Sequence, residues 1–516
     1  MATVLPGGAK PGRLAELFLL LFALALSFFA YAQVALAVAG RLPAQMALQC
    51  GGLTALALAL HVILRWRAPY ADPVILPAAV LLNGIGLAMI YRLALRYEET
   101  GTDPGGVIAP KQMAWTVLGV VAAAITIIWL RDHRLLRRFT YTAMLLGLAG
   151  LVAPLLPFIG NTVYGARIWI RIGPLSIQPA EASKILLVVF FAGYLVTHRD
   201  AMALAGPRLA GLQLPRLRDL GPIMLAWLVS LGVLVFERDL GTSLLLFAIF
   251  VAMLYVATNR PSWIIIGLFL FAGGVVLAYR LFSHVQNRLA IWLHPFDQTL
   301  YDAPLGGSYQ LVQGLFGLAN GGLFGTGLGR GRPDITPLAY SDFVFASLGE
   351  ELGLTGVIAI LLVYLVLVER GFRTAIGIRD GFGKLAATGL AFALAFQLFV
   401  VVGGVTRVIP LTGLVTPFLA YGGSALLTNW VVVALLLRIS DGARRPPPAT
   451  SEIDLGAVAE AAEGSRQGRA SDSAAPAKSK TSPRARPGKA DQAKPAASAR
   501  RGSSADASKT EAVSRP

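Results

Sequence analysis

The chain has 516 residues, of which 55% are hydrophobic and only 14% are charged, and its mean hydropathy is +0.65. Soluble domains carry roughly 25% charged residues, so the composition excludes an ordinary soluble domain and predicts a polytopic membrane protein. The net charge of +17 does not indicate nucleic-acid binding, because much of it lies in short connections between apolar runs. Cys50 is the single cysteine, which excludes an intrachain disulfide.

Twelve apolar runs are candidates to cross the membrane, since a helix needs about 20 residues to span about 30 Å of hydrocarbon. No small-residue cleavage site follows the first run, so we expect a retained helix rather than a signal peptide. The sixth, seventh and eighth runs are short, and one of them could be re-entrant or broken. The sequence therefore predicts an all-α polytopic integral membrane protein. The runs cover approximately residues 14–38, 46–64, 73–93, 112–130, 139–159, 182–197, 220–236, 241–257, 262–281, 353–369, 385–404 and 415–438.

Basic residues occur in alternate connections, which predicts the orientation of the helices. With the N-terminus in the cytoplasm, the arginine-rich connections are cytoplasmic, whereas 39–45, 94–111 and 405–414 face outward and carry few basic residues. Twelve spans also place the C-terminus inside and the long loop 281–351 outside. The cytoplasmic basic residues are Arg65, Arg67, Arg131, Arg134, Arg137, Arg138, Arg199, Arg208, Arg216, Arg218, Arg260, Arg370, Arg373, Arg379 and Lys384.

The tail 441–516 has almost no large apolar residues and carries 14 Lys/Arg against 9 Asp/Glu. Such a segment buries too little surface to offset its ordering entropy, so we expect disorder. It could attract anionic headgroups, at about 1 kcal/mol per nearby basic residue, bind a partner, or have no specific role.

Charged residues next to the spans are the first candidates for a functional site. Pro179 suits the first turn of a helix, which puts Glu181 and Lys184 on one helix face at the outer boundary. They could line an outward-facing polar cavity, or form an ion pair that only orients the helix. The charges from Glu237 to Asp239 favour an ordinary hydrated turn, unless the neighbouring runs are half-helices.

The long loop 281–351 holds most of the other candidates. Asp297 and Asp302 could act as a general base toward a sugar hydroxyl, although on residue type alone each is more simply a hydrated loop carboxylate. Arg288 is an outward-side basic residue that could contact a phosphate-bearing ligand. The Gly- and Pro-rich segment 403–424, which includes Arg407, indicates a broken or closely packed helix and could line a ligand groove.

Six short motifs occur in a fixed order between about Trp169 and Ser440. They are Gln178-Pro179-x-Glu181-x-x-Lys184, Asp239-Leu240-Gly241-Thr242, Asp302 to Gln310, Gly321-Gly322-Leu323-Phe324-Gly325-x-Gly327, Asp342-Phe343 to Gly353, and Pro410-Leu411-Thr412-Gly413 to Ser424. In this order they resemble the SEDS family (shape, elongation, division and sporulation; RodA, FtsW and SpoVE). The family's Asp-Pro-x-Gly-x-Gly-Tyr-Gln motif is one residue longer here. The segment Val402 to Pro410 resembles the version found in high-GC Gram-positive bacteria and favours the elongation (RodA-type) branch.

The resemblance implies an inverting peptidoglycan glycosyltransferase that polymerises lipid II outside the plasma membrane. Asp302 would be the general base for the GlcNAc 4-hydroxyl that attacks the MurNAc anomeric carbon, with Asp297 as its rival. The undecaprenyl pyrophosphate leaving group needs no acid if cations stabilise it, and a divalent cation, Mg²⁺ or Mn²⁺, could take part. The side chains expected to bind substrate are Glu181, Lys184, Arg288, Tyr309, Gln310 and Arg407.

Because family members usually have ten spans, the resemblance implies that the two additional spans of this chain are N-terminal. We therefore divide the chain into three regions. These are N-terminal transmembrane helices in 1–110, a catalytic membrane core in 111–440 and the basic tail 441–516. The expected partners are a class B penicillin-binding transpeptidase and the elongation or division machinery. A division-type (FtsW-type) role stays open, as do a non-enzymatic scaffold and a lipid II flippase. Inverted repeats would favour the flippase, and none is evident in the sequence.

Overall fold

The structure is a computed structural model that describes residues 12–99, 108–157, 159–163, 166–173, 175–203, 208–209, 212–213, 228–229, 232, 239–303 and 307–446. Within these residues, eleven helices are long and apolar enough to cross a membrane, which confirms an all-α polytopic membrane protein. They correspond to eleven of the twelve predicted runs. The other run, 220–236, lies almost entirely outside the described residues, and so does the predicted disordered tail beyond Pro446.

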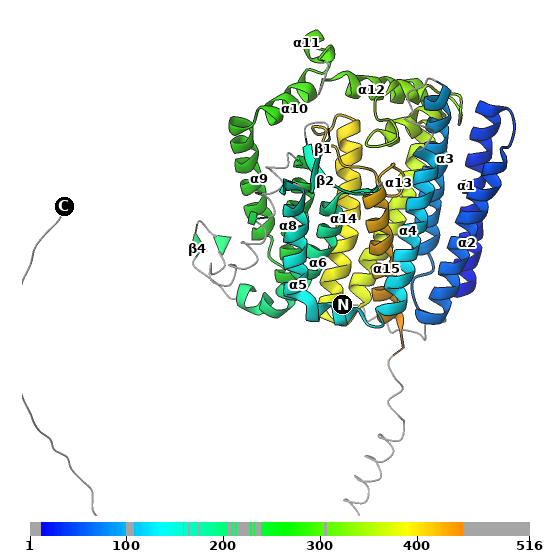
Figure 1. Cartoon of the computed structure of the whole chain (residues 1–516). Coiled ribbons are helices and arrows are strands. Elements are labelled where there is room, and N and C mark those ends of the chain that lie inside the picture. Colours follow the sequence, from blue (N-terminus) through cyan, green and yellow to red (C-terminus); the bar gives the residue numbers. More distant parts are fainter. Residues whose placement is uncertain are drawn as a thin grey trace, which may run out of the picture. The chain divides into compact units, whose positions relative to one another are not determined.

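The spanning helices stand side by side, and shorter helices lie across one end of the bundle (Figure 1). α9 exposes nearly its whole apolar surface, as expected of a helix that faces lipid. The helices that span are α1 (Arg13–Ala39), α2 (Ala44–Arg67), α3 (Ile75–Glu99), α4 (Ile108–Trp129), α5 (Thr140–Val152, preceded by the 3₁₀ turn η1, His133–Phe139, and followed by η2, Ala153–Leu155), α6 (Pro179–Ala203), α8 (Leu240–Thr258), α9 (Ser262–Leu281), α13 (Val344–Gly377), α14 (Gly381–Val405) and α15 (Gly423–Arg444).

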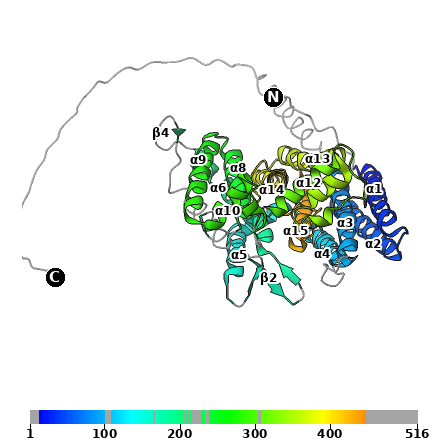
Figure 2. The ribbon, with the colours of Figure 1, turned by 90° about the horizontal axis from the view of Figure 1, so that it is seen from above.

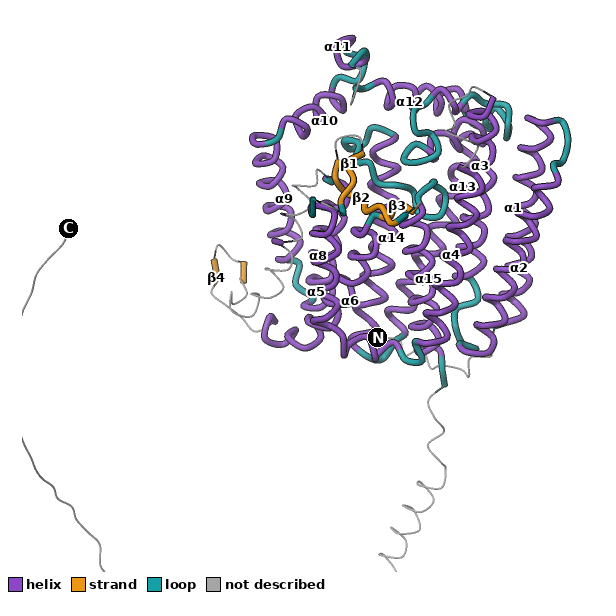
Figure 3. The backbone as a smooth tube through the Cα atoms, in the orientation of Figure 1, coloured by secondary structure: helices purple, strands orange, loops and turns teal. Residues whose placement is uncertain are grey.

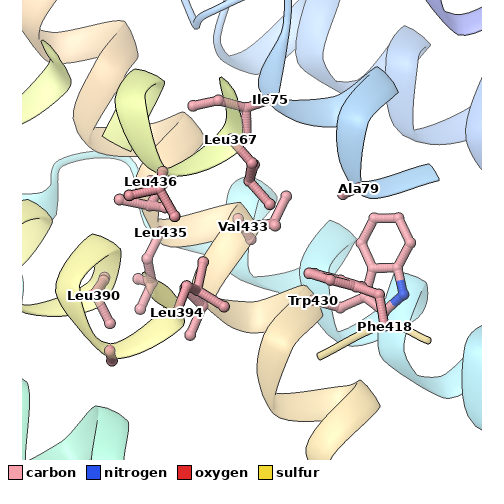
Figure 4. Close-up of a cluster of buried hydrophobic side chains, with 14 of the residues drawn as sticks. Ile75, Ala79, Leu367, Leu390, Leu394, Phe418, Trp430, Val433, Leu435 and Leu436 are labelled. Carbon is pink, nitrogen blue, oxygen red and sulfur yellow. The ribbon is translucent and has the colours of Figure 1, made fainter. Parts of the chain in front are cut away.

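The centre of the bundle is formed by α3, α13, α14 and α15. Trp430 is fully buried and meets the ring of Phe418 edge-on, at 5.8 Å between ring centroids. Small residues let α13 and α14 approach, since a Cβ added at Gly371 would lie 2.7 Å from the Cβ of Ala391. Such close packing is what holds helices together in lipid. Figure 4 shows Ile75, Ala79, Leu367, Leu390, Leu394, Val433, Leu435 and Leu436 around this centre.

A three-stranded antiparallel sheet between α5 and α6 was not predicted. Its strands pair in chain order: β1 (Gly160–Val163), β2 (Ala166–Ile172) and β3 (Leu175–Ile177). The signal was present, because isoleucine recurs at every second residue from 168 to 172. Seen from above, β2 projects from the side of the bundle beside α5 (Figure 2). The sheet leads directly into Pro179 and so positions the start of α6. A separate two-stranded pair joins β4 (Arg208–Leu209) to β5 (Leu212–Gln213).

The predicted outer loop 281–351 is largely helical, and these helices were not predicted. It contains α10 (Ser283–Leu293), α11 (Gln298–Tyr301), α12 (Tyr309–Gly321) and η3 (Pro333–Ile335). α13 also begins before the predicted run 353–369, because a helical segment joins it across a kink at Gly353, where φ is 67°. A Cβ there would lie 2.2 Å from the backbone nitrogen of Gly325, so only glycine fits.

Glu350 and Glu351, expected at the end of the outer loop, are buried beside this kink. Glu351 forms an ion pair with Arg92 of α3 at 2.8 Å and accepts a hydrogen bond from the amide of Gly329. Glu350 accepts a hydrogen bond from the amide of Arg332 at 2.8 Å. The two carboxylates therefore hold the glycine-rich loop 322–332 against the bundle.

The Gly- and Pro-rich segment after α14 is a broken helix, as its composition indicated. α14 ends at Val405 and α15 begins only at Gly423, later than the predicted start at 415. Between them the chain is not helical, and it lies among the helices rather than outside them, because Tyr364 of α13 donates a hydrogen bond to the carbonyl of Pro417. Figure 3 shows such loops and the three strands gathered at the end of the bundle near α10 and α12.

Candidate functional site

The predicted pair on α6 is present and buried. Lys184 Nζ lies 2.7 Å from a carboxylate oxygen of Glu181, and both residues are at most 5% exposed. Lys184 also donates a hydrogen bond to Gln397 Oε1 of α14 at 2.8 Å. Gln397 in turn donates to the carbonyl of Val415 at 2.9 Å. The pair thus connects α6 to α14 and to the broken segment 406–422.

Asp239 lies beside this pair and is buried, so the favoured expectation of a hydrated turn was wrong for it. Its carboxylate caps α8 by accepting hydrogen bonds from the amide and the hydroxyl of Thr242, at 2.9 and 2.7 Å. Gln178 Nε2 donates at 3.3 Å to Asp239 Oδ2, the oxygen that also accepts the Thr242 hydroxyl. Burial raises the pKa of Asp239, and the nearby carboxylate of Glu181 adds to this. Glu237 lies outside the described residues.

Arg288 of α10 brings a second cation to the same place. Its guanidinium donates hydrogen bonds to the carbonyls of Leu411 and Thr412, at 3.3 and 3.1 Å. Burial lowers the pKa of Arg288, and the carboxylates of Asp239 and Asp342 oppose that shift. Arg288 therefore lies between two carboxylates and holds the broken segment 406–422 against α10.

Asp342 completes the group of charges just before α13. Burial raises its pKa to about 6, against the opposing effects of its backbone hydrogen bonds and of Arg288. Gln310 of α12 lies 3.4 Å from Asp342 Oδ1 and donates a shorter hydrogen bond, of 2.9 Å, to the carbonyl of Pro337. We call Glu181, Lys184, Asp239, Arg288 and Asp342 the polar cluster.

The polar cluster contains two cations and three carboxylates from separate segments of the chain. Three of its members were expected to bind substrate: Glu181, Lys184 and Arg288. With two cations and three carboxylates, the cluster offers both charged donors and charged acceptors to a polar ligand. Gln310 belongs to its rim, while Tyr309 stacks edge-on against Tyr301, 5.2 Å between ring centroids.

Asp302 does not join the polar cluster. It follows α11, which projects beyond the bundle in Figure 1, and its side chain is exposed and accepts a hydrogen bond from Gln298 at 2.6 Å. Its rival Asp297 caps α11 by accepting hydrogen bonds from the hydroxyl and amide of Thr299. These hydrogen bonds hold the pKa of Asp297 below its usual range. A capping carboxylate of lowered pKa is a poor general base, whereas Asp302 is free to approach a substrate.

Arg407 has a different environment from the one expected of a substrate-binding residue. Its Nε and a terminal nitrogen donate to the carbonyls of Trp292 and Leu293, at 2.8 and 3.0 Å, and its backbone has φ 61°. Trp292 Nε1 returns a hydrogen bond to the Arg407 carbonyl at 3.1 Å. In this structure Arg407 therefore binds the C-terminal end of α10 and positions it.

The described residues contain no group of three or more His, Cys, Asp or Glu side chains that could hold a metal ion by themselves. Asp239 and Asp342 of the polar cluster flank Arg288. Mg²⁺ is often held by one or two carboxylates together with substrate phosphates. A divalent cation would thus depend on ligands that the substrate brings.

Asp239, Asp342 and Gln397 were not among the predicted site residues. Asp239 could have been found from its helix-capping pattern, Asp239-x-x-Thr242, at the start of a span. Asp342 precedes the first turn of α13, which the predicted start of that span obscured. Gln397 is a buried polar residue within the apolar part of α14, and such residues are usually functional or bound to a partner.

Comparison with known proteins now identifies the class. The sequence model of the FtsW/RodA/SpoVE family, described as "Cell cycle protein", matches residues 73–445. The chain belongs to this family of polytopic membrane proteins. α1 and α2 precede the matched region, and the whole polar cluster lies within it.

Several relatives have names that specify an activity. The chain is 53% identical to the peptidoglycan glycosyltransferase RodA of Mycobacterium tuberculosis (strain ATCC 25618 / H37Rv) over 387 residues, which are 75% of this chain and 81% of the relative. It is 52% identical to RodA of Mycobacterium leprae, with the same coverage of both chains. The probable peptidoglycan glycosyltransferase FtsW of Trichlorobacter lovleyi is 33% identical, over 74% of this chain and 96% of the relative.

Solved structures support the same fold. A chain from a study of the structural coordination of polymerization and crosslinking by a peptidoglycan synthase complex is 25% identical with a TM-score of 0.54, over 70% of this chain and 96% of that chain. A mutant of the Rod shape determining protein RodA of Thermus thermophilus has a TM-score of 0.51 at 24% identity, over 73% and 99%. Because its sequence identity is low, the Thermus thermophilus structure supports the fold alone.

Proposed function

We propose that this protein polymerises lipid II into glycan strands during cell-wall synthesis in cell elongation. Peptidoglycan glycosyltransferase activity follows from family membership and from more than 50% identity with RodA proteins, against 33% with an FtsW protein. The RodA-type function is therefore favoured over the division-type alternative. Lipid II as the substrate, the roles of individual residues and the orientation in the membrane are our proposals.

The observation that carries the proposal is the polar cluster. A lipid-linked sugar donor has a diphosphate beside its anomeric carbon, and Lys184 and Arg288 supply two cations toward such a group. Glu181 is ion-paired with Lys184, and the charge of Asp239 acts on Arg288. The cluster lies at the end of the spans, where a headgroup can enter while its lipid tail stays in the bilayer.

The reaction is a displacement with inversion. The oxygen of an incoming GlcNAc 4-hydroxyl forms a bond with the MurNAc anomeric carbon, and the bond from that carbon to the undecaprenyl pyrophosphate breaks. We assign the hydroxyl proton to Asp302; because its exposed side chain lies outside the polar cluster in this structure, the assignment requires it to approach the cluster when both substrates are bound. The leaving diphosphate takes both electrons of the broken bond, and Lys184 and Arg288 offset its charge.

The arginine-rich connections support a cytoplasmic location for the opposite end of the bundle, and we infer that the polar cluster and α10 to α12 face outward. That orientation suits a reaction on the outer side of the plasma membrane. One similar solved structure comes from a peptidoglycan synthase complex that coordinates polymerization with crosslinking. We infer that this protein also works with a class B penicillin-binding transpeptidase, which would crosslink the strands it makes.

Purified lipid II tests the proposed function directly. We expect the full-length protein in detergent or nanodiscs, together with its cognate transpeptidase, to convert lipid II into a ladder of glycan strands on a gel. Folded protein that makes no polymer with this partner would contradict the proposal and favour a flippase or scaffold. A flippase would instead move fluorescent lipid II between leaflets of a vesicle without polymerising it.

A further inference from the structure

The end of the bundle opposite the polar cluster contains a cavity that the glycosyltransferase reaction does not use. Its volume is about 320 Å³, and it is lined by Arg134 and Arg137 of η1, Val196 of α6, and Arg379, Asp380 and Phe382 at the start of α14. Three arginines at one cavity are a concentration of positive charge. The charge of the cavity therefore suits an anionic ligand.

Asp380, the one carboxylate of the cavity wall, is already engaged. Its Oδ2 lies 2.7 Å from His133 Nε2 and 3.6 Å from Arg134 Nε, and its Oδ1 accepts the amide of Gly383 at 2.7 Å. Although burial would raise the pKa of Asp380, these hydrogen bonds and charges hold it at about 2. Asp380 is thus a fixed negative charge, and it cannot neutralise all three arginines.

Arg137 and Arg379 are exposed and form no ion pair within the part of the chain that the structure describes. Exposed apolar side chains accompany the arginines on η1: Leu135 is 50% exposed and Phe139 is 48% exposed. A short helical element that carries both arginines and exposed apolar residues is typical of the boundary between headgroups and acyl chains. The cavity itself has apolar walls at Val196 and Phe382.

We propose that this arginine cavity binds the phosphodiester headgroup of an anionic phospholipid in the cytoplasmic leaflet. The arginines contact the phosphate, while Leu135 and Phe139 lie against the acyl chains. Basic pockets between transmembrane helices on the cytoplasmic side are sites of this kind. The apolar flank favours a lipid over a soluble phosphate compound, which would gain nothing from it.

The bound lipid would join three elements that the candidate site depends on. The cavity lies where η1, α6 and α14 meet, and the opposite halves of α6 and α14 carry Lys184 and Gln397, which are hydrogen-bonded to each other. A ligand that binds only the folded protein stabilises it. The lipid should therefore raise the melting temperature of the protein and stabilise the packing of α6 against α14.

Retention of dioleoyl-phosphatidylglycerol by the purified full-length protein tests the proposal, with dioleoyl-phosphatidylcholine as the neutral comparison. We expect the wild type to retain phosphatidylglycerol in native mass spectrometry and to melt at a higher temperature with it. Arg137→Gln should weaken binding about fivefold, because a basic residue near a lipid surface contributes about 1 kcal/mol. The triple change Arg134→Gln, Arg137→Gln and Arg379→Gln should abolish selective retention.

Two control variants keep the test decisive. Arg138→Gln removes an exposed arginine of the same turn that does not line the cavity, and it should retain the lipid as the wild type does. A triple change of the same three arginines to Lys keeps the charge and should recover most of the binding. Equal retention of phosphatidylglycerol by the wild type and the triple Gln variant would overturn the proposal. It would also be overturned if Arg138→Gln lost as much phosphatidylglycerol as the triple Gln variant does. Stabilisation by inorganic phosphate or ATP but not by phosphatidylglycerol would also overturn it.

Discussion

The polar cluster and α11 carry carboxylates in opposite environments. In the cluster, Glu181 and Asp239 are buried; Glu181 is ion-paired with Lys184 one turn along α6, and Asp239 accepts hydrogen bonds from Thr242 and Gln178. Directly after α11, Asp302 is exposed, and among the described residues its side chain is bonded to Gln298 of the same turn. The buried carboxylates of the polar cluster serve both folding and ligand binding. An exposed carboxylate such as Asp302 can be removed with little effect on folding.

This difference decides how mutations are to be interpreted. Loss of activity after a change in the polar cluster reports stability and catalysis together, because removing one member leaves its partner buried and uncompensated. Loss of activity after a change at Asp302 reports the chemistry alone. The predictions below test this separation, from the largest expected effect to the smallest.

Lys184→Met should have the largest effect on folding. It leaves Glu181 as a buried, unpaired carboxylate, and breaking a buried pair in this way typically costs about 3–5 kcal/mol. Thermal unfolding in detergent and glycan polymerisation should both show the loss. The double variant Glu181→Gln/Lys184→Met should regain part of the stability. The exposed Lys111→Met is the matched control and should melt as the wild type does; equal destabilisation by Lys111→Met would remove the burial argument.

Asp342 should make stability depend on pH. Its pKa in the folded protein is about 6, above the ordinary 3.8, so folding favours the protonated carboxyl. This contribution is fully present below about pH 4 and is lost as the pH rises through about 6. The melting temperature of Asp342→Asn should fall less than that of the wild type between those pH values. Glu99→Gln, at an exposed ion pair, serves as control. Identical pH profiles for Asp342→Asn and the wild type would show that Asp342 is not perturbed.

Asp297→Asn should have the smallest effect. Asn also caps helices well, and α11 has only four residues, so the expected change in stability is about 0.5 kcal/mol or less. The variant should keep most of the polymerising activity, measured with lipid II under the conditions used for the wild type. Loss of polymer with unchanged melting would make Asp297 the base.

Much of the fold could be predicted from the sequence, because lipid forces each span into a long apolar helix. Eleven of the predicted runs are helices of the described structure. The errors occur where the backbone is held by tertiary contacts. Glu350 and Glu351 look like loop residues in the sequence, and only the contact with Arg92 and the kink at Gly353 explain their burial. The strands β1 to β3 were missed because their alternating pattern is short.

The candidate site could be predicted only in part, because most of it depends on contacts between distant segments. Local spacing was enough to pair Glu181 with Lys184, since both lie on one helix face. Spacing could not show that Asp239 and Asp342 approach Arg288, because these residues come from three distant segments. It also could not show that the guanidinium of Arg407 is occupied by the end of α10. Motif order indicated the family, and the packing of the bundle determined which charges meet.

The most direct test of the account is the polymerisation of purified lipid II by Asp302→Ala, with its melting temperature measured on the same preparation. We predict that polymer formation falls by at least about 100-fold, the usual contribution of a general base. The melting temperature should stay at that of the wild type, because the Asp302 side chain is exposed. Robust polymer from well-folded Asp302→Ala would contradict the assignment of the base to α11 and return the search to the polar cluster.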